Sequence, residues 1–261
     1  EPDVPLKTTV TGLKAGLFMQ HTARPLPGVT IILGVRADYF SRSGRASTSP
    51  RASLAWQIDP LTKLSASAGI FRQTLPALLL ARQPRQELQD MHARHYIIGF
   101  ERLLTADTKF SVEAYRKNYS RFPIAGSEPG LFIVDELVYS YGFYQNHGEL
   151  ASAGEAYSRG IEMIVQKKMA RNIYGLASAT WFRSRYRGGD GIWRDRAYDN
   201  RIIVALEGGY RPSHGWEMSL RWIYAGGSPY TPIDPAASQV AHNTVLQASR
   251  INSARYPDYH A

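Results

Sequence analysis

The chain has 261 residues, of which 44% are hydrophobic and 20% are charged, with a formal net charge of +9 and no cysteine. This composition is typical of a folded protein, and it excludes a disulfide framework and a thiolate metal site. No apolar run approaches the roughly 20 residues of a membrane-spanning helix, but strands of a membrane β-barrel need an apolar residue only at every second position. The basic residues are scattered without a Lys/Arg block, so we expect no nucleic-acid partner.

Alternation of apolar and polar residues, bounded by turn-forming residues, predicts strand after strand and no amphipathic helix. In chain order, the predicted strands span residues 11–22, 28–41, 49–58, 62–73, 92–104, 108–120, 156–169, 173–184, 200–211 and 216–226. Many of them have the roughly 9 to 11 residues that a tilted strand needs to cross a bilayer. The expected fold class is therefore all-β, with about ten to twelve long strands.

The connections between the predicted strands alternate in length. Short, turn-forming links are predicted at residues 25–27, 59–61, 105–107, 170–172 and 212–215. Longer connections are predicted at residues 42–48, 74–91, 121–155, 185–199 and 227–257. In an antiparallel up-and-down meander, this alternation places all turns at one end and all loops at the other, as in large transmembrane β-barrels of the outer membrane. A soluble sandwich with Greek-key crossings has no reason to sort its loops in this way.

The two faces of the predicted strands differ in polarity. We expect the apolar faces to contact lipid, with an interfacial girdle of Tyr39, Trp56, Trp181, Tyr210, Trp216 and Tyr224 near the strand ends. We expect the polar faces to line a wide aqueous lumen, where charges of both signs form cross-strand ion pairs and hydrogen bonds. The charged residues expected to face the lumen in this structural role are Arg36, Asp38, Arg51, Glu101, Glu113, Glu162, Glu207, Glu217 and Arg221.

Aromatic and basic residues gather in two of the predicted long loops. Residues 131–147 contain Tyr139, Tyr141 and Tyr144, and residues 185–198 contain Tyr186, Arg187, Trp193 and Arg194. Such side chains on external loops could bind a chelate or a glycan. The alternative is that these loops pack on one another over the mouth of the barrel.

No pattern in the sequence predicts catalysis or metal binding. His92 and His95 are the only histidines close together, and on a strand this spacing points their rings to opposite faces. The sequence has no H-E-x-x-H motif, no phosphate-binding glycine loop and no evident acid–base–nucleophile set. We therefore expect no metal site, no cofactor and no enzyme activity.

Several segments, in the order found there, resemble the barrel portion of TonB-dependent outer-membrane receptors. They are GVRADYF (34–40), SPRASLAWQIDPLTKLSASAGIFRQTLP (49–76), YIIGFERLLTADTKFSVEAYRKNY (96–119), YSRGIEMIVQKK (157–168), the 222–233 run with GSPYTPI, and RYPDYH (255–260). The resemblance covers nearly the whole chain, and the ordered set of segments carries it.

The resemblance implies a roughly 22-stranded barrel, plugged by an N-terminal domain, in the outer membrane of a Gram-negative-type bacterium. It implies active uptake of a scarce ligand, such as an iron chelate, cobalamin or an oligosaccharide, with energy delivered through the TonB protein. Residues 1–261 would then form one partial barrel domain without the plug and the last strands. The implied partners are outer-membrane lipid, the plug domain, the TonB protein and the small-molecule or oligosaccharide ligand.

Two other hypotheses stay open from the residues alone. One is a soluble all-β binding module that presents a sheet face to a glycan or a protein. The other is an outer-membrane barrel enzyme, which needs a catalytic set that the sequence does not display. An arginine on the outward apolar face distinguishes the membrane barrel from the soluble module, because lipid contact makes a charge costly there.

Overall fold

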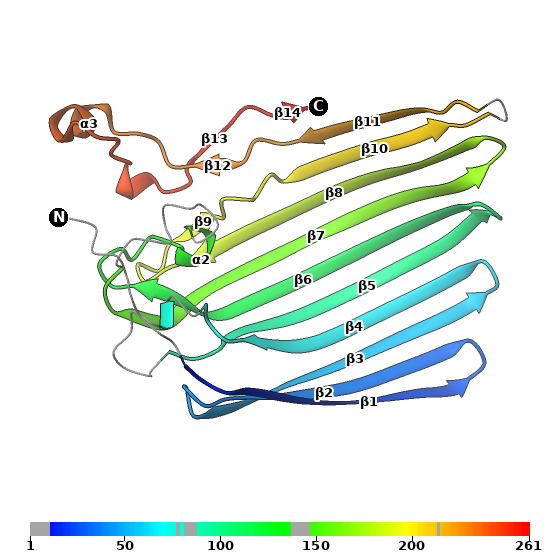
Figure 1. Ribbon diagram of the computed structural model, residues 1–261, viewed down its shortest axis with the longest axis horizontal. Helices are drawn as coiled ribbons and strands as arrows, with labels where there is room; N and C mark the ends of the chain where they lie inside the picture. Colours follow the sequence, from blue (N-terminus) through cyan, green and yellow to red (C-terminus); the bar gives the residue numbers. More distant parts are fainter. Residues whose placement is uncertain (1–10, 77–78, 81–87, 137–146, 213–214) are drawn as a thin grey trace.

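One antiparallel sheet makes up most of the fold. In this computed structural model, the described residues are 11–76, 79–80, 88–136, 147–212 and 215–261. The strands of the sheet are β1 (Lys14–Leu26), β2 (Val29–Phe40), β3 (Arg45–Asp59), β4 (Thr62–Gln73), β5 (Met91–Thr105), β6 (Thr108–Ala125), β7 (Leu150–Ala170), β8 (Ile173–Arg187), β9 (Trp193–Asp195), β10 (Ile202–Tyr210), β11 (Met218–Ala225) and β14 (Tyr259–His260). Their order is β1-β2-β3-β4-β5-β6-β7-β8-β10-β11-β14, with β9 paired to β8 (Figure 1). The predicted all-β, up-and-down meander is therefore confirmed.

The remaining elements lie in the long connections, at the end of the sheet that Figure 1 shows on the left. They are the paired strands β12 (Pro229–Tyr230) and β13 (Ala254–Arg255), the helices α2 (Ile133–Glu136) and α3 (Pro235–Ala241), and the 3-10 helix η1 (Ala248–Arg250). None of the described helices is long and apolar enough to span a membrane. We term this end the loop end and the opposite end the turn end.

All ten predicted strands are present, and several extend further toward the loop end than predicted. The β6–β7 ladder continues to the pair Ala125 and Leu150, beyond the predicted limits of residues 120 and 156. Two irregularities in the register, at Phe122 and Pro123, break the regular alternation there. Because periodicity was the signal for a strand, the prediction stops where the alternation stops.

The prediction of a long connection at residues 42–48 is wrong. Residues 41–44 form a tight turn instead, and β3 begins directly at Arg45. Gly44 has a φ angle of +61°, and its amide donates to the Phe40 carbonyl at 3.0 Å. Glycine adopts this left-handed conformation without steric cost, so the chain reverses within four residues.

The turn between β1 and β2 depends on Gly28, one residue beyond the predicted turn at 25–27. Its φ angle is +77°, and a Cβ atom at this position would lie 2.5 Å from the Gln57 carbonyl oxygen. Only glycine therefore fits this close approach. Leu26 still belongs to β1, where it pairs with Val29.

The register divides the side chains between two faces, which we term the polar face and the apolar face. The polar face includes Arg36, Arg51, Glu101, Glu113, Glu162, Glu207 and Arg221, and the apolar face includes Leu33, Leu54, Ile98, Ile161, Trp181 and Leu206. On the apolar face, the exposed fractions are 63% for Ile98 and 56% for Trp181. The preceding residues on the polar face, Ile97 and Thr180, are only partly exposed. The more exposed face is thus the apolar one, which is the reverse of a sheet that packs on a soluble core.

The hydrophobic core lies at the loop end, over the polar face. One buried cluster consists of Leu75, Leu79, Leu88, Ala125 and Ile133, and a second consists of Phe122, Phe132, Ala156 and Tyr186. Ala156 and Tyr186 are direct cross-strand partners on the polar face. The connections after β4 and β6 therefore bury their apolar side chains against the loop end of the sheet.

Candidate functional site

Six aromatic side chains follow one another across the polar face at the loop end, and we term them the aromatic ladder. In order, they are Phe71, His95, Tyr119, Phe122, Phe132 and Tyr186. Successive ring centroids are 4.5, 6.1, 5.7, 5.0 and 4.7 Å apart. This spacing is typical of interacting aromatic pairs. The ladder connects β4 to β8 through rings that contact one another.

The register of the sheet explains how the rings meet. Phe71, Tyr119 and Tyr186 lie in one row across β4, β6 and β8, and Ala93 and Ala156 occupy the positions between them. A small residue on each intervening strand gives the larger rings space to lean toward their neighbours. The ladder therefore depends on the alternation of large and small side chains across the strands as well as along them.

The ladder has a closed half and an open half. The closed half consists of Phe122, Phe132 and Tyr186, and the open half consists of Phe71, His95 and Tyr119. Tyr186 is fully buried, and its hydroxyl donates to the Gly130 carbonyl at 2.7 Å. Phe71, at the other end, is 40% exposed. A ligand that reaches this face can stack only on the open half.

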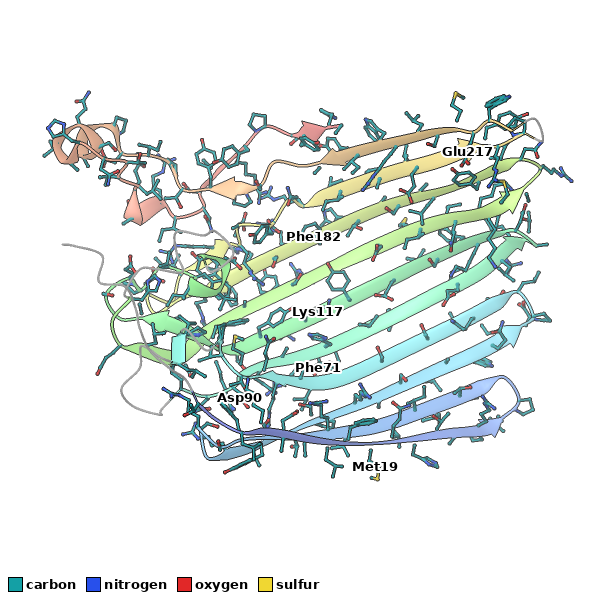
Figure 2. All side chains as sticks on the ribbon, in the orientation of Figure 1. Met19, Phe71, Asp90, Lys117, Phe182 and Glu217 are labelled. Carbon is teal, nitrogen blue, oxygen red and sulfur yellow. The ribbon has the colours of Figure 1, made fainter. Side chains whose placement is uncertain are left out.

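Polar groups border the ladder. Lys117 is the direct cross-strand partner of His95, and Figure 2 shows Phe71 and Lys117 at a similar level of the wall. The Nε2 atom of His95 is buried, and no described residue forms a hydrogen bond with it. Above the closed half, the Arg196 guanidinium lies 4.9 Å from the ring centre of Phe132. Aromatic rings beside cations suit a flat or an anionic ligand.

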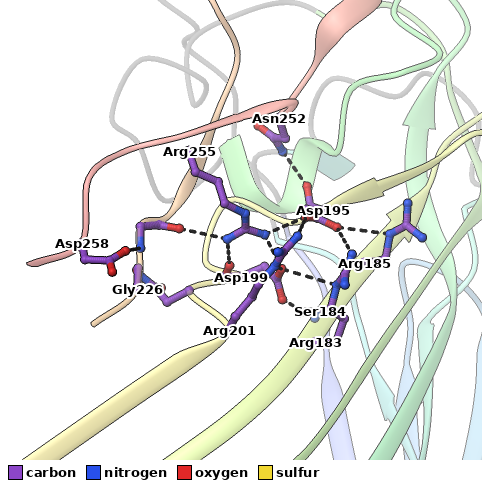
Figure 3. Close-up of polar contacts among 12 residues, drawn as sticks. Arg183, Ser184, Arg185, Asp195, Asp199, Arg201, Gly226, Asn252, Arg255 and Asp258 are labelled. Carbon is purple, nitrogen blue, oxygen red and sulfur yellow. Dashed lines mark hydrogen bonds and ion pairs between the residues drawn. The ribbon is translucent and has the colours of Figure 1, made fainter. Parts of the chain in front are cut away.

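A second polar group, which we term the Arg–Asp cluster, lies where the connections after β8 and β11 meet (Figure 3). Its members are Arg183, Arg185, Asp195, Asp199, Arg201 and Arg255. Asp199 is fully buried, and it accepts hydrogen bonds from the Ser184 amide at 2.6 Å and from Arg255 at 2.7 Å. Arg255 Nη2 also lies 2.7 Å from Asp195. The cluster holds β13 against the loop end of β8.

Sequence reasoning alone missed the Arg–Asp cluster. One signal that could have pointed to it is the RYPDYH segment at residues 255–260, whose charged residues lie outside every predicted long strand. The structure gives this segment two anchors. Arg255 binds the two aspartates, and Asp258 accepts from the Gly227 amide at 3.0 Å and from the Tyr224 hydroxyl at 2.6 Å.

The Arg–Asp cluster should lose stability in acid. Burial by itself raises the pKa of Asp195, but the hydrogen bond from Arg255 and the charge of Arg183 lower this pKa below its ordinary value. A depressed carboxylate pKa contributes stability above the unfolded-state pKa of about 3.9, and this contribution is lost as the pH falls through the folded-state pKa. Corrected for intrinsic rates, amide exchange in residues 193–201 and 252–258 should be constant from about pH 7 to about pH 5 and accelerate below about pH 4. In Asp195→Asn this acceleration should be weaker. If exchange in this variant depends on pH in the same way as in the unaltered protein, the carboxylate of Asp195 is not the source of the acid sensitivity.

The structure divides the predicted ligand-binding residues. Three of them, Tyr139, Tyr141 and Tyr144, lie outside the described residues. The other four lie on the β8–β9 hairpin, where Tyr186 pairs with Arg194 and Arg187 pairs with Trp193. Since neighbouring residues of a strand point to opposite faces, these two pairs do not share one surface.

Each described member of this group already has a partner within the chain. Arg194 Nη2 lies 2.6 Å from Asp190, and its side chain is only 9% exposed. Arg187 Nη2 lies 2.6 Å from Glu155, and the guanidinium lies 5.4 Å from the ring centre of Trp193. These contacts rigidify the hairpin, as in the alternative that the loops pack on one another.

The predicted charged residues lie on one face. Eight of them, Arg36, Asp38, Arg51, Glu101, Glu113, Glu162, Glu207 and Arg221, share the polar face through the register. The ninth, Glu217, accepts a hydrogen bond from the hydroxyl of Tyr174, which lies on the same face. Lys63 forms an ion pair with Glu101 at 2.5 Å. Several of these charges are therefore partnered within the wall.

The described residues contain no group of three or more His, Cys, Asp or Glu side chains arranged to hold a metal ion. His92 and His95 lie on opposite faces of β5, because they are three positions apart in a regular strand. His92 Nδ1 lies 3.2 Å from the Ser120 hydroxyl. The two rings therefore do not converge on a shared ion.

Comparison with solved structures finds the same fold in outer-membrane proteins. Similar structures include the FrpB iron transporter from Neisseria meningitidis (14% identity, TM-score 0.67), the outer membrane transporter YddB from Escherichia coli (10%, 0.69) and the ferripyoverdine receptor of the outer membrane of Pseudomonas aeruginosa (11%, 0.66). Each match covers 95% of this chain and 37%, 38% and 31% of the respective solved chain. The chain thus spans about a third of the length of these proteins.

Family membership rests on the sequence. No curated protein sequence matches the chain. The family described as "TonB dependent receptor-like, beta-barrel" matches residues 4–260, which is nearly the whole chain. The meander, the two unlike faces and this match agree, and the chain belongs to the TonB-dependent receptor-like β-barrel family.

Proposed function

We propose that this chain forms part of the wall of an outer-membrane receptor that actively takes up a scarce ligand, and that the ligand is an iron chelate. The observation that carries the proposal is the reversed polarity of the sheet, in which the apolar face is the more exposed one. A continuous apolar band of this kind is unfavourable in water, whereas in a bilayer it contacts acyl chains. The polar face then lines an aqueous lumen.

Aromatic residues at both ends of the strands support this placement. Trp56, Tyr210 and Trp216 lie near the turn end, and their exposed fractions are 47%, 39% and 52%. Tyr39 and Trp181 lie nearer the loop end and are 42% and 56% exposed. Amphipathic rings favour the two interfaces of a membrane. The turns would then face the periplasm and the loops the exterior.

We assign the predicted lumen-facing charges a structural role in the wall. The ion pair between Lys63 and Glu101, and the direct opposition of Glu207 and Arg221, support this role. Opposite charges across neighbouring strands stabilise a sheet modestly, by about 0.2 to 1 kcal/mol for each pair. In this proposal the ligand contacts residues at the loop end, and these lumen-facing charges do not bind it.

The open half of the aromatic ladder, together with Lys117, is the proposed contact surface for the ligand. Rings can stack on the planar groups of a chelate, and the ammonium group attracts its negative charge. The names of two similar structures, an iron transporter and a ferripyoverdine receptor, support iron chelates as the ligand class ahead of cobalamin and oligosaccharides. Tyr186 and Arg194 act indirectly in this proposal, by holding the loop structure behind the ladder.

Family membership also supports the proposed partners. Lipid would contact the apolar face, and a plug domain would occupy the lumen that the polar face lines. The TonB protein would supply the energy for uptake. A transporter of this kind needs no catalytic set and no resident cofactor of its own.

Phe71→Ala should weaken uptake of the ligand in cells that depend on the full-length protein. We expect the half-saturating concentration to rise about two- to tenfold, because an aromatic pair contributes about 0.5 to 1.5 kcal/mol. The measurement is uptake of radioactive iron presented as a tris-catecholate and as ferripyoverdine, with labelled cobalamin and a maltooligosaccharide in parallel. Tyr39→Ala is the matched control, since it removes an exposed ring at the loop end of the apolar face.

The outcomes separate the parts of the proposal. If uptake of none of the four probes depends on the protein, the receptor function is wrong. Uptake of cobalamin or the oligosaccharide alone would keep the receptor and overturn the iron-chelate assignment. An equal loss in Phe71→Ala and Tyr39→Ala would remove the aromatic ladder from the binding site.

A further inference from the structure

Three arginines lie side by side on the apolar face near the loop end, and we term them the arginine row. Arg116 on β6 is the direct cross-strand partner of Arg159 on β7, which is the direct partner of Arg183 on β8. Arg94 lies one step further toward the loops on β5, and it is exposed. Like charges directly opposite one another destabilise a sheet. A negative charge bound beside a row of three would relieve this repulsion.

Of the three arginines, the described residues supply a carboxylate to Arg183 alone. Arg116 donates to the Asn118 amide oxygen at 3.1 Å, and Arg159 lies 5.5 Å from the ring centre of Tyr157. Neither these two nor Arg94 forms an ion pair with a described carboxylate. Arg183 shares the two carboxylates of the Arg–Asp cluster with three further arginines. The whole region therefore keeps an excess of positive charge.

An apolar groove begins at the arginine row. It has a volume of about 680 Å³, and small residues such as Ala66, Ala68 and Ala114 form part of its lining, with Arg116 at its loop-side end. A second hollow of about 440 Å³ shares Ala66 and Ala114 with it and continues toward the turn end, as far as Trp56. Together they lie across β3 to β6 and extend from the level of Arg116 to the level of Trp56, so an acyl chain that runs from the arginine row toward the turn end can lie in them.

We propose that this surface binds one lipid whose head group carries a phosphate monoester, with the phosphate on the arginine row and an acyl chain in the groove. Arginine presents a planar fork of N–H donors that matches phosphate oxygens, and such charge-assisted bonds are strong. The groove selects a lipid over a free anion, because only an amphiphile fills both parts. This inference rests on the proposed membrane placement of the apolar face, and it adds a specific lipid site to that placement.

The test is native mass spectrometry of the full-length protein in a neutral detergent, with phosphatidic acid and a diacylglycerol of the same acyl chains. Phosphatidic acid should be retained at least about tenfold more strongly than the diacylglycerol, since one hydrogen bond to a charged group accounts for a difference of that size. The double variant Arg116→Gln/Arg159→Gln should lose about tenfold or more of this retention. Arg171→Gln, an exposed arginine in the turn between β7 and β8, is the matched control and should change nothing.

Two further measurements separate lipid binding from a structural role. Without lipid, the double variant should unfold at the same temperature or higher, because it removes repulsion between neighbouring charges. Ala114→Phe should fill the groove and weaken retention of phosphatidic acid although every arginine is kept. Equal retention of the two lipids, or retention that the double variant does not change, would overturn the proposal. Since binding is measured in detergent, this failure is distinct from a failure of uptake or membrane insertion.

Discussion

Leu206→Arg should lower the free energy of unfolding of the membrane-inserted protein by about 2 to 4 kcal/mol. Leu206 lies in the middle of β10, on the apolar face, and it is 44% exposed between its cross-strand partners Ala177 and Trp222. A guanidinium group at the bilayer midplane loses its water, and the lipid offers no partner for it. The measurement is urea unfolding from phospholipid vesicles, followed by tryptophan fluorescence.

Ser178→Arg is the matched control for this experiment. Ser178 is the neighbour of Ala177 on β8, but the register places it on the polar face, opposite Ala205. In an aqueous lumen, an added arginine at this position should change the free energy of unfolding by much less than Leu206→Arg does. If Leu206→Arg inserts normally and is as stable as the unaltered protein, the proposal that the apolar face contacts lipid is wrong. The soluble binding module would then be the better hypothesis, with another protein layer over the apolar face.

Arg255→Ala should destabilise the loop end by about 3 kcal/mol, because it removes a partner from the fully buried carboxylate of Asp199. Arg201 and Arg183 lie 3.8 and 3.9 Å from that carboxylate, too far to replace the hydrogen bond. Amide hydrogen exchange in residues 252–260 should accelerate by roughly 100-fold, while exchange in the middle of the strands stays unchanged.

Arg250→Ala provides the control within the same segment. Arg250 is exposed, and its contact with a neighbouring side chain is a hydrogen bond to Gln247 at 3.3 Å. Its removal should leave exchange almost unaltered, since exposed contacts contribute little. If the two variants change exchange by similar amounts, or if neither changes it, the Arg–Asp cluster is not what holds β13 in place.

Much of the wall could be predicted from the sequence because its signal is local. Apolar and polar residues alternate along each strand, and the pleat converts this alternation directly into two faces. Hence all ten long strands and the shared face of Arg36, Glu101 and Arg221 follow from periodicity together with an up-and-down order. Predictions failed where local chemistry departed from this pattern, as at Gly44, where one glycine turned an expected loop into a tight turn.

The loop end could not be predicted in this way, because its contacts join residues that are far apart in the chain. Phe71 and His95 are 24 positions apart, and Asp199 and Arg255 are 56 positions apart. No periodicity within one segment carries the register that aligns such residues across several strands. Neighbours along the chain set the strands, their order and the polarity of their faces, so the residues alone suffice to predict them. Register and loop packing set which rings form the aromatic ladder, which charges form the Arg–Asp cluster and which arginines share a row, so these groups emerge only in the folded chain.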